Sequence, residues 1–358
     1  MSLHARVQAF IAATPEGREP FDGLACDIAR HQAALVPAVA RLFEAEGVDA
    51  ERLRDADAIP AVVTDAFRHR RIATHPEAQD TRVFETSGTS LGEEQRGRHP
   101  MRDLGSYVAG ALAWGEAHLW PDLPPEELAF IGLVAPEDLA PRSSLTFMLA
   151  RFAERMASAS YHWDGETLDV AAVQAATTTT ARPTLVAGTS FAFVHLLDSL
   201  GDTRLPLPPG SRVMQTGGFK GRSREIEATT LRRELAELFA IPEAMIVAEY
   251  GMTELSSQLY QISLRRHLGL PTPSGDPFGY AAPPWLRVTA VDPVSLQPVA
   301  PGEVGLARFV DLANVDSAVA IQTADRIRLG EGGLVELLGR APGAPPRGCS
   351  LALEHLLS

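Results

Sequence analysis

The sequence predicts an α/β fold, because short apolar segments alternate with helical patterns in its middle part and a series of strands closes the chain. Most of these segments are followed closely by Gly, Ser or Thr and then by a helical pattern, as expected for buried strands of an α/β sheet. The chain has 358 residues, 45% of them hydrophobic, and is long enough for one large domain or two unequal ones. The predicted buried strands are 128–134, 184–187, 211–215 and 245–248.

The first predicted region, residues 1–80, is helical. Apolar residues repeat at three- and four-residue spacing over 21–46, and the helical pattern continues over 60–69 after a turn. Residues 81–284 follow as an α/β core, in which 103–119 is a further predicted helix.

After the Pro-rich segment 271–284, the hydrophobic period changes to that of consecutive strands joined by Pro-Gly and Glu-Gly-Gly turns. We therefore expect a β-rich subdomain over 285–340, built as a β meander. Region 341–358 is predicted to be a Pro/Gly linker and C-terminal tail that contains Cys349. The predicted strands of the meander are 285–292, 305–312, 318–323 and 334–338.

Composition and charge narrow the class of function. The 45 acidic residues exceed the 32 basic ones, and the formal net charge of −13 argues against nucleic acid or an anionic membrane as a partner. A small-molecule substrate is the expectation. Two cysteines, no basic-then-apolar leader and no apolar run of about 20 residues predict a reduced, cytoplasmic protein without a transmembrane segment. Lys220 is the only lysine in the chain.

A cluster of hydroxyl side chains follows the short apolar segment at Val83 and Phe84. Thr86-Ser87-Gly88-Thr89-Ser90 offers four hydroxyls and a flexible glycine ahead of a predicted helix, which is the order of parts in a phosphate-binding unit. The alternative is a plain turn, and the segment lacks the lysine of a P-loop.

Two further segments place polar groups at the ends of predicted strands. Glu249 to Glu254 follows a buried strand, and ligands of open α/β sheets bind at the carboxyl ends of strands. The alternative is a helix N-terminus capped by Thr253. Gln322 to Arg326 is predicted to end a strand, where Asp325 can bind a pair of hydroxyls such as those of a ribose, or form an ordinary turn.

Taken together and in order, these motifs resemble a known superfamily. Thr86 to Ser90, Tyr250 to Glu254, Thr323 to Asp325 and Gly339-Arg340 resemble the core motifs of the adenylate-forming acyl and aryl ligases. Within that superfamily, Glu-Tyr-Gly-Met-Thr-Glu-Leu and the terminal Arg-Gly-Cys-Ser-Leu are similar to the acyl-protein synthetase component of the bacterial luciferase fatty-acid reductase system. The resemblance runs from about residue 82 onward and implies an adenylate-forming N-terminal domain with a terminal β subdomain and a truncated C-terminal domain.

The resemblance implies ATP and Mg²⁺ as cofactors and gives each matching position a role. Glu254 would bind Mg²⁺, Asp325 the ribose hydroxyls, and Arg340 the nucleotide near the hinge. Gly188 to Ser190 would line the carboxylate pocket. The phosphate-binding residues would be Thr86, Ser87, Gly88, Thr89 and Ser90. The residues near the adenine and the α-phosphate would be Gly217, Gly218, Phe219, Tyr250 and Gly251, with Met252 and Thr253 completing the motif.

The implied reaction is activation of a carboxylic acid, expected to be a fatty acid, to acyl-AMP, followed by transfer to a protein thiol as a thioester. Cys349 is the candidate acceptor, with a buried and chemically unimportant cysteine as the alternative. The catalytic lysine of the superfamily's C-terminal domain has no counterpart, and Lys220 is the candidate replacement, in contact with the carboxylate or the α-phosphate. An acyl reductase is the expected protein partner.

Two other classes of function stay open from the sequence. The segment around Gly188-Thr189-Ser190 imitates a nucleophile elbow, so a serine hydrolase with Ser190 as nucleophile is one alternative. A non-catalytic scaffold that binds nucleotide or acyl group for an acyl reductase is the other. Metal-dependent hydrolysis is disfavoured, because the ten histidines show no His-Glu-x-x-His spacing.

Overall fold

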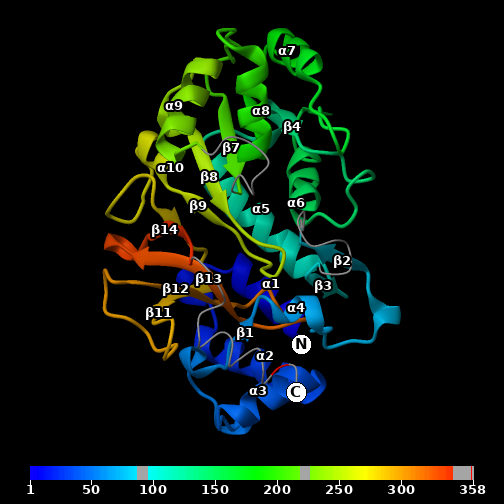
Figure 1. The fold of residues 1–358 in the computed structure, drawn as a ribbon, viewed down its shortest axis with the longest axis vertical. Coiled ribbons are helices and arrows are strands. Elements are labelled where there is room, and N and C mark those ends of the chain that lie inside the picture. Colours follow the sequence, from blue (N-terminus) through cyan, green and yellow to red (C-terminus); the bar gives the residue numbers. More distant parts are fainter. Residues whose placement is uncertain (87–95, 218–225, 342–355, 357–358) are drawn as a thin grey trace. The chain divides into compact units, whose positions relative to one another are not determined.

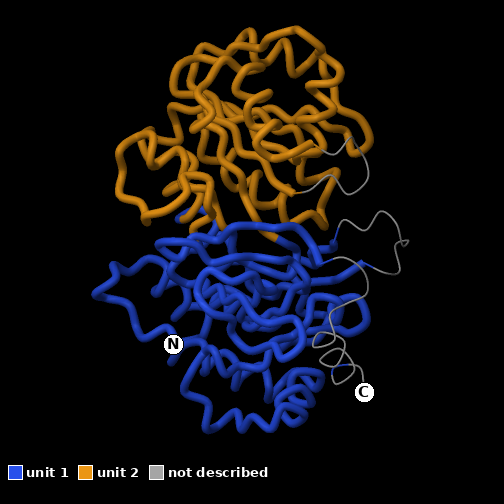
Figure 2. Tube along the Cα trace, turned by 60° about the vertical axis from the view of Figure 1, so that its left-hand side comes forward, with its two compact units in different colours: residues 1–113, 252–258, 282–358 blue, residues 114–251, 259–281 orange. Residues whose placement is uncertain are grey.

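The structure is a computed structural model that describes residues 1–86, 96–217, 226–341 and 356. The chain divides into two compact units (Figure 2). Unit 1 comprises residues 1–113, 252–258 and 282–358, and unit 2 comprises residues 114–251 and 259–281. The four regions expected along the sequence are a different division of the chain and stay a prediction.

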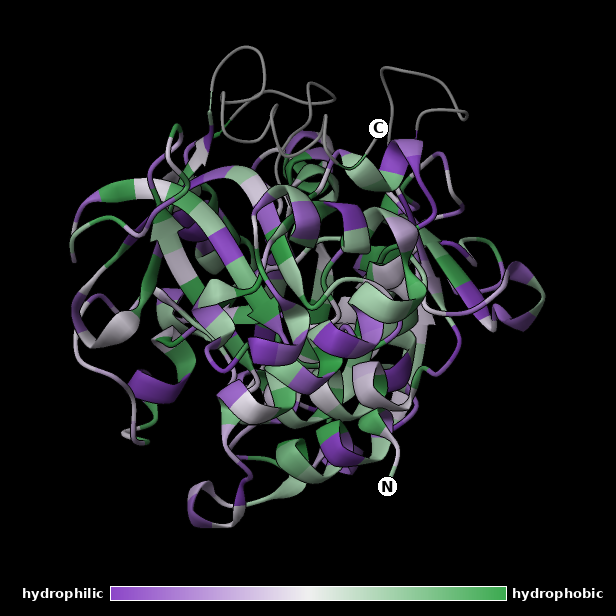
Figure 3. Ribbon diagram, turned by 90° about the horizontal axis from the view of Figure 1, so that it is seen from below, coloured by the Kyte–Doolittle hydropathy of each residue, from purple (hydrophilic) through white to green (hydrophobic). Residues whose placement is uncertain are grey.

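Unit 1 begins with the helices expected for the N-terminal region (Figure 1). In Figure 3, hydrophilic and hydrophobic residues alternate along the helices near the N-terminus. Helix α2 buries one side, which includes Leu24, Ile28 and Gln32. Pro37 begins α3 at the position where its missing N–H costs no helical hydrogen bond. The helices of this unit are α1 (Leu3–Ala12), α2 (Phe21–Leu35), α3 (Pro37–Ala45), α4 (Ala66–His69) and the start of α5 (Gly105–Leu119).

The expectation of a continuous helical pattern over 60–69 is wrong. Val62 and Val63 form a short strand, β1 (Val62–Val63), which pairs in parallel with Ile321 and Gln322. β-Branched residues favour extended backbone, and the neighbouring strand supplies the hydrogen bonds that a helix would have made locally. Helix α4 begins only after this strand.

The β meander expected at the end of the chain is confirmed in unit 1. Four successive strands pair antiparallel in the order β11, β12, β13 and β14, and β1 lies on β13. Asp325 does not end a strand as expected, because β13 continues to Leu329 past an irregularity in its pairing with β14. A separate hairpin joins β2 to β3. The strands are β2 (Arg82–Glu85), β3 (Arg98–Met101), β11 (Leu286–Val291), β12 (Val304–Asp311), β13 (Ala320–Leu329) and β14 (Val335–Arg340).

Unit 2 is built on a mostly parallel sheet with the order β10-β9-β8-β7-β6-β4-β5. All four predicted buried strands are present as β4, β6, β7 and β8, and the side chains at their centres are completely buried, as parallel strands covered on both faces require. The strands are β4 (Ala129–Leu133), β5 (Ser158–Tyr161), β6 (Thr184–Thr189), β7 (Arg212–Thr216), β8 (Ile246–Tyr250), β9 (Leu259–Gln261) and β10 (Tyr280–Ala281). The helices are the end of α5, α6 (Ser144–Ala153), α7 (Val170–Thr179), α8 (Ser190–Leu200), α9 (Ala228–Phe239) and α10 (Ser263–His267). Among the described residues, none of the helices combines the length and the apolar character needed to cross a bilayer.

Candidate active site

The residues after β8 form a turn and not the start of a helix. The N–H of Leu255 donates to the carbonyl oxygen of Met252 at 3.2 Å, and the chain then enters β9. The alternative that made Thr253 a helix cap is therefore wrong. The hydroxyl of Thr253 instead donates to the carbonyl oxygen of Glu85 at 3.4 Å. This turn places the side chain of Glu254 inside unit 1.

The carboxyl group of Glu254 lies close to Thr86 and Gly97, which together we call the base of the segment predicted to bind phosphates. Thr86 and Gly97 face each other across that base: the N–H of Thr86 donates to the carbonyl oxygen of Gly97, and the N–H of Gly97 donates to Thr86 Oγ1, both at 2.9 Å. A Cβ atom added to Gly97 would lie 3.2 Å from Oε1 of Glu254 and 3.1 Å from Cγ2 of Thr86. Two predicted motifs separated by more than 150 residues thus meet at one point.

Glu254 is a buried carboxyl group. Its residue is 7% exposed, and burial raises its pKa to about 7, although the charges of Arg68 and Arg340 act in the opposite direction. In the described part of the chain no basic side chain forms an ion pair with it. A carboxylate held in this way is stabilised by any cation that binds beside it.

The predicted ribose-binding and hinge residues also lie together in unit 1. Asp325 on β13 pairs in register with Arg340 on β14, and Nε of Arg340 lies 3.2 Å from Oδ1 of Asp325. The Asp325 side chain is 20% exposed and that of Arg340 is 67% exposed, so a ligand can reach both. The structure therefore brings together Thr86, Glu254, Asp325 and Arg340 as parts of one unit.

In unit 2 the predicted residues gather at the carboxyl ends of neighbouring parallel strands. Thr216 on β7 pairs with Glu249 on β8, directly before Gly217 and Tyr250 respectively. Gly217 has a φ of +74°, a conformation that glycine adopts without strain, so the chain can leave the sheet at once. Tyr250 is half-buried at the strand end.

Glu249 is a second buried carboxyl group to which the sequence assigned no role of its own. Burial raises its pKa to about 7, and among the described residues the hydroxyl of Thr216 donates a hydrogen bond to it. The signal in the sequence was its place at a strand's carboxyl end, which marks ligand sites in sheets of this type.

The surroundings of Ser190 argue against a serine hydrolase. Thr189 caps α8 by accepting from the N–H of Ala192, which leaves Ser190 as the first helical residue. The Ser190 hydroxyl is directed at carbonyl oxygens, those of the Gln215 side chain and of the Gly217 backbone, the latter at 2.8 Å. In the described residues no histidine accepts its proton, and an acyl-transferring serine requires such a base.

Comparison with known proteins identifies the family. Residues 176–358, just over half of the chain, match the family described as acyl-protein synthetase, LuxE. The chain belongs to the LuxE family of acyl-protein synthetases. A curated relative, the long-chain-fatty-acid–luciferin-component ligase of Aliivibrio fischeri, is 24% identical over 179 aligned positions, and the match covers 46% of this chain and 44% of that protein. The aligned part of the chain thus spans less than half the length of this relative.

Solved structures show the same fold. An open conformation of 2-hydroxyisobutyryl-CoA ligase, in complex with 2-HIB-AMP and CoA, superimposes with a TM-score of 0.65 at 15% identity and covers 89% of this chain and 69% of its own. An ATP-bound RpMatB-BxBclM chimera superimposes with a TM-score of 0.50 at 15% identity, covering 72% of this chain and 47% of its own. This LuxE-family chain therefore has the mixed α/β fold of the N-terminal domain of adenylate-forming acyl-CoA ligases, as expected.

Part of the site expected in this LuxE-family chain lies outside the described residues. The roles given to these positions stay predictions. They are Ser87, Gly88, Thr89, Ser90, Gly218, Phe219, Lys220 and Cys349.

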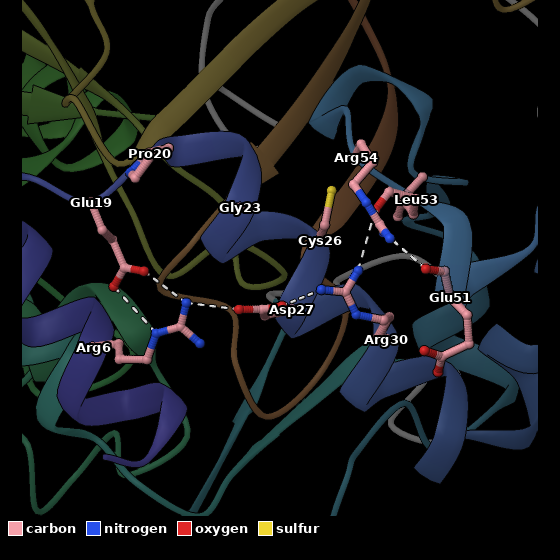
Figure 4. A pocket seen from close by; sticks show the side chains of 10 residues that line it. All are labelled: Arg6, Glu19, Pro20, Gly23, Cys26, Asp27, Arg30, Glu51, Leu53 and Arg54. Atoms are coloured by element: carbon pink, nitrogen blue, oxygen red, sulfur yellow. Dashed lines mark hydrogen bonds and ion pairs between the residues drawn. The ribbon is translucent and has the colours of Figure 1, made fainter.

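A cavity of about 340 Å³ in the N-terminal part of unit 1 contains none of the predicted site residues (Figure 4). Its charges pair with one another: Arg6 binds Glu19 and Asp27, and Arg30 binds Asp27. The sulfur of Cys26 lines the cavity, and burial raises the pKa of this thiol, which keeps it in its unreactive protonated form. We assign no ligand to this cavity.

Proposed function

We propose that this chain activates a carboxylic acid with Mg·ATP to an acyl adenylate and passes the acyl group to a protein thiol. Membership of the LuxE family supports an acyl-protein synthetase of the adenylate-forming type. The observation that carries the proposal for this chain is the buried carboxyl group of Glu254 beside Thr86 and Gly97, at the base of the predicted phosphate-binding segment.

The residues around Glu254 fit a bound Mg²⁺. Mg²⁺ prefers hard oxygen ligands and is commonly held by one or two carboxylates together with phosphate and water oxygens. Glu254 supplies one such carboxylate, and the described residues contain no group of three His, Cys, Asp or Glu side chains that could hold a metal alone. When bound, Mg²⁺ would neutralise charge on the phosphate oxygens.

The chain's own residues would bind and orient the nucleotide. Oγ1 of Thr86 accepts from the N–H of Gly97, and its own proton would be donated to a phosphate oxygen. The hydroxyls of Ser87, Thr89 and Ser90 would donate in the same way. Asp325 would accept hydrogen bonds from the ribose hydroxyls, and its ion pair with Arg340 orients its carboxylate.

The remaining nucleotide-binding roles are proposed on the family's motif alone. They belong to Gly217, Gly218, Phe219, Tyr250, Gly251, Met252 and Thr253.

The proposed reaction has two steps. A carboxylate oxygen of the acid forms a bond to the α-phosphorus as the bond from that phosphorus to pyrophosphate breaks, which turns a poor leaving group into AMP. A thiolate then attacks the acyl carbon, AMP leaves, and a thioester remains. Oriented N–H groups and cations stabilise the charge that develops in the first step, and we propose Lys220 as one of them. Cys349 is the proposed thiol.

The substrate is proposed from the relative's name, and the partner is proposed from the chemistry of the product. A ligase for long-chain fatty acids favours a fatty acid as the substrate of this chain as well. A thioester of this kind is an activated acyl group, and an acyl reductase is the class of protein that would consume it.

The test is ATP/pyrophosphate exchange over short, long and aromatic acids, with Glu254→Gln and Cys349→Ala beside the unmodified protein. ATP/pyrophosphate exchange should require a carboxylic acid and should be lost in Glu254→Gln. Cys349→Ala should keep this exchange but should no longer form the protein-bound thioester. Glu237→Gln removes a carboxylate that is 53% exposed and pairs with Arg204, and should match the unmodified protein. Nucleotide binding without exchange for every acid would refute the proposal and leave the scaffold alternative.

A further inference from the structure

The backbone on both sides of Glu254 is held by side chains from distant parts of unit 1. Nδ1 of His99, on β3, lies 2.7 Å from the carbonyl oxygen of Thr253. Nδ2 of Asn314, in the loop between β12 and β13, donates to the carbonyl oxygen of Glu254 at 2.8 Å. Two peptide planes meet at the Cα of Glu254, and each carries one of these bonds. Because peptide groups are planar, fixing both planes fixes the backbone dihedral angles of Glu254.

The partners of His99 determine its tautomer. A carbonyl oxygen only accepts, so Nδ1 carries the proton and donates to Thr253, while Nε2 accepts from the hydroxyl of Ser317 at 2.7 Å. Complete burial lowers the pKa of His99 to about 4, so the ring is neutral near pH 7. The ring packs against Phe67 in a T-shaped arrangement, with the ring centroids 5.9 Å apart. The imidazole therefore has one orientation.

Asn314 is equally constrained. Its Nδ2 also donates to the carbonyl oxygen of Ala318 at 3.0 Å, and its Oδ1 accepts from the hydroxyl of Ser256 at 2.6 Å. The two carbonyl acceptors require an N–H₂ group on their side, which settles the orientation of the amide. Asn314 thus binds the segment at Glu254 and again two residues later.

The loop that carries Asn314 and Ser317 is itself held on two sides. Asp311, at its start, accepts from the N–H of Ser256 at 3.0 Å and from the hydroxyl of Ser257 at 2.7 Å. Gln32, on α2, donates to the carbonyl oxygen of Asn314 at 2.7 Å and accepts from the N–H of Val319 at 2.8 Å. The residues that form this network are each less than 3% exposed. Helix α2 therefore supports the segment 252–258 through this loop.

We infer that His99 and Asn314 are positioning residues, which hold the Glu254 carboxylate at the place where it meets the phosphate-binding segment. The inference rests on the proposed role of Glu254 in binding Mg·ATP. Buried polar networks in which every group is paired fix one arrangement of the backbone, whereas loss of one partner leaves another buried group unpaired. Apart from the turn bond between Leu255 and Met252, the segment 252–258 has no helix or strand of its own, so side chains fix the rest of its conformation.

The test uses two substitutions of His99 that each keep half of its bonds. The amide N–H₂ of Asn lies near the position of Nδ1, so His99→Asn keeps the donor to Thr253. Gln reaches the position of Nε2, so His99→Gln keeps a partner for Ser317 and loses the bond to Thr253. Two quantities are measured: hydrogen–deuterium exchange of a peptide containing 252–258, and the Mg²⁺ concentration that gives half-maximal pyrophosphate exchange.

His99→Gln should raise both the exchange rate of 252–258 and the Mg²⁺ requirement, each by about tenfold, which corresponds to the loss of one buried hydrogen bond. His99→Asn, which keeps the donor to Thr253, should leave the hydrogen–deuterium exchange rate and the Mg²⁺ requirement within about threefold of their values in the unmodified protein. If His99→Gln does not fold, Ser317→Ala removes only the donor to Nε2 and should shift both quantities in the same direction by a smaller factor.

His118→Gln is the matched control. His118 is also buried, in unit 2, and its Nδ1 lies 3.1 Å from the carbonyl oxygen of Trp114. Its substitution should lower the melting temperature without changing the exchange of 252–258 or the Mg²⁺ requirement.

The inference would be overturned if His99→Gln left the hydrogen–deuterium exchange of 252–258 unchanged, or if His99→Gln and His99→Asn had equal effects. It would also be overturned if His99→Gln accelerated the hydrogen–deuterium exchange of 252–258 without changing the Mg²⁺ requirement. Inactivity of the unmodified protein with every acid would refute the proposed function alone. In that case the exchange of 252–258 still decides whether His99 fixes the segment.

Discussion

Replacing Glu254 by Gln is expected to stabilise the folded protein at pH 8 while it removes the proposed activity. Burial raises the pKa of Glu254 from 4.5 to about 7, so the folded protein ionises this group less readily than the unfolded chain does. At about 1.4 kcal/mol for each pH unit between the two pKa values, the ionised carboxylate lowers the free energy of unfolding by about 3 kcal/mol. Gln has nearly the same size and carries no charge.

The sign of the effect sets its pH dependence. Well below pH 4.5 the carboxyl group is protonated in both states, and the two proteins should be equally stable apart from pH-independent effects. Between pH 4.5 and about 7 the unfolded chain loses its proton first, so the unmodified protein loses stability relative to the variant as the pH rises. Above this range the difference should be constant.

Thermal denaturation at several pH values from 5 to 8 measures this difference. A change of about 3 kcal/mol corresponds to a melting temperature roughly 4 °C higher for the variant at pH 8, because the entropy of unfolding of a chain of 358 residues is about 0.75 kcal/mol/K. Mg·ATP should stabilise the unmodified protein more than the variant, because binding to the folded state adds to stability. Glu237→Gln, which removes an exposed carboxylate that pairs with Arg204, is the control: it should show no such gain in stability and should keep its response to Mg·ATP. A variant no more stable than the unmodified protein at pH 8, or a gain of the same size at pH 5, would refute the reasoning.

Three further predictions concern other parts of the chain. Gly97→Ala should lower pyrophosphate exchange about tenfold, because its Cβ would lie 3.2 Å from Oε1 of Glu254, whereas Gly23→Ala meets nothing within 4 Å and should have no effect on this assay. Asp316→Asn should reduce the free energy of unfolding by about 3 kcal/mol in chemical denaturation, because this buried carboxylate accepts from the Arg102 side chain and two backbone N–H groups and lies 3.1 Å from Nε2 of His4. Those partners hold the pKa of Asp316 well below 3.8. The extra stability of the unmodified protein over Asp316→Asn should therefore be lost as the pH falls below about 4. A difference in the free energy of unfolding that persists at low pH would contradict the assignment. A fluorophosphonate should leave Ser190 unlabelled by mass spectrometry, and stoichiometric labelling would revive the hydrolase alternative.

The local pattern of the sequence determined much of the architecture. The four buried strands of unit 2 and the meander of unit 1 follow from hydrophobic period and turn residues, which act over a few neighbours in the chain. The same reasoning failed at 62–63 and at Asp325. At these places pairing with a strand far away in the sequence decides the backbone conformation, and no local pattern reports it.

The order of the motifs along the chain also determined the family and singled out Glu254, Tyr250 and Asp325 as candidate site residues. Sequence order does not say which side chains touch. Glu254 lies beside Gly97, and His99 and Asn314 hold its two flanking peptide groups, through hydrogen bonds between residues more than 50 positions apart. Buried histidine, asparagine and glutamine look like ordinary polar residues in a sequence. Their role appears only when folding removes them from water, because each buried donor must then find an acceptor wherever the chain places one.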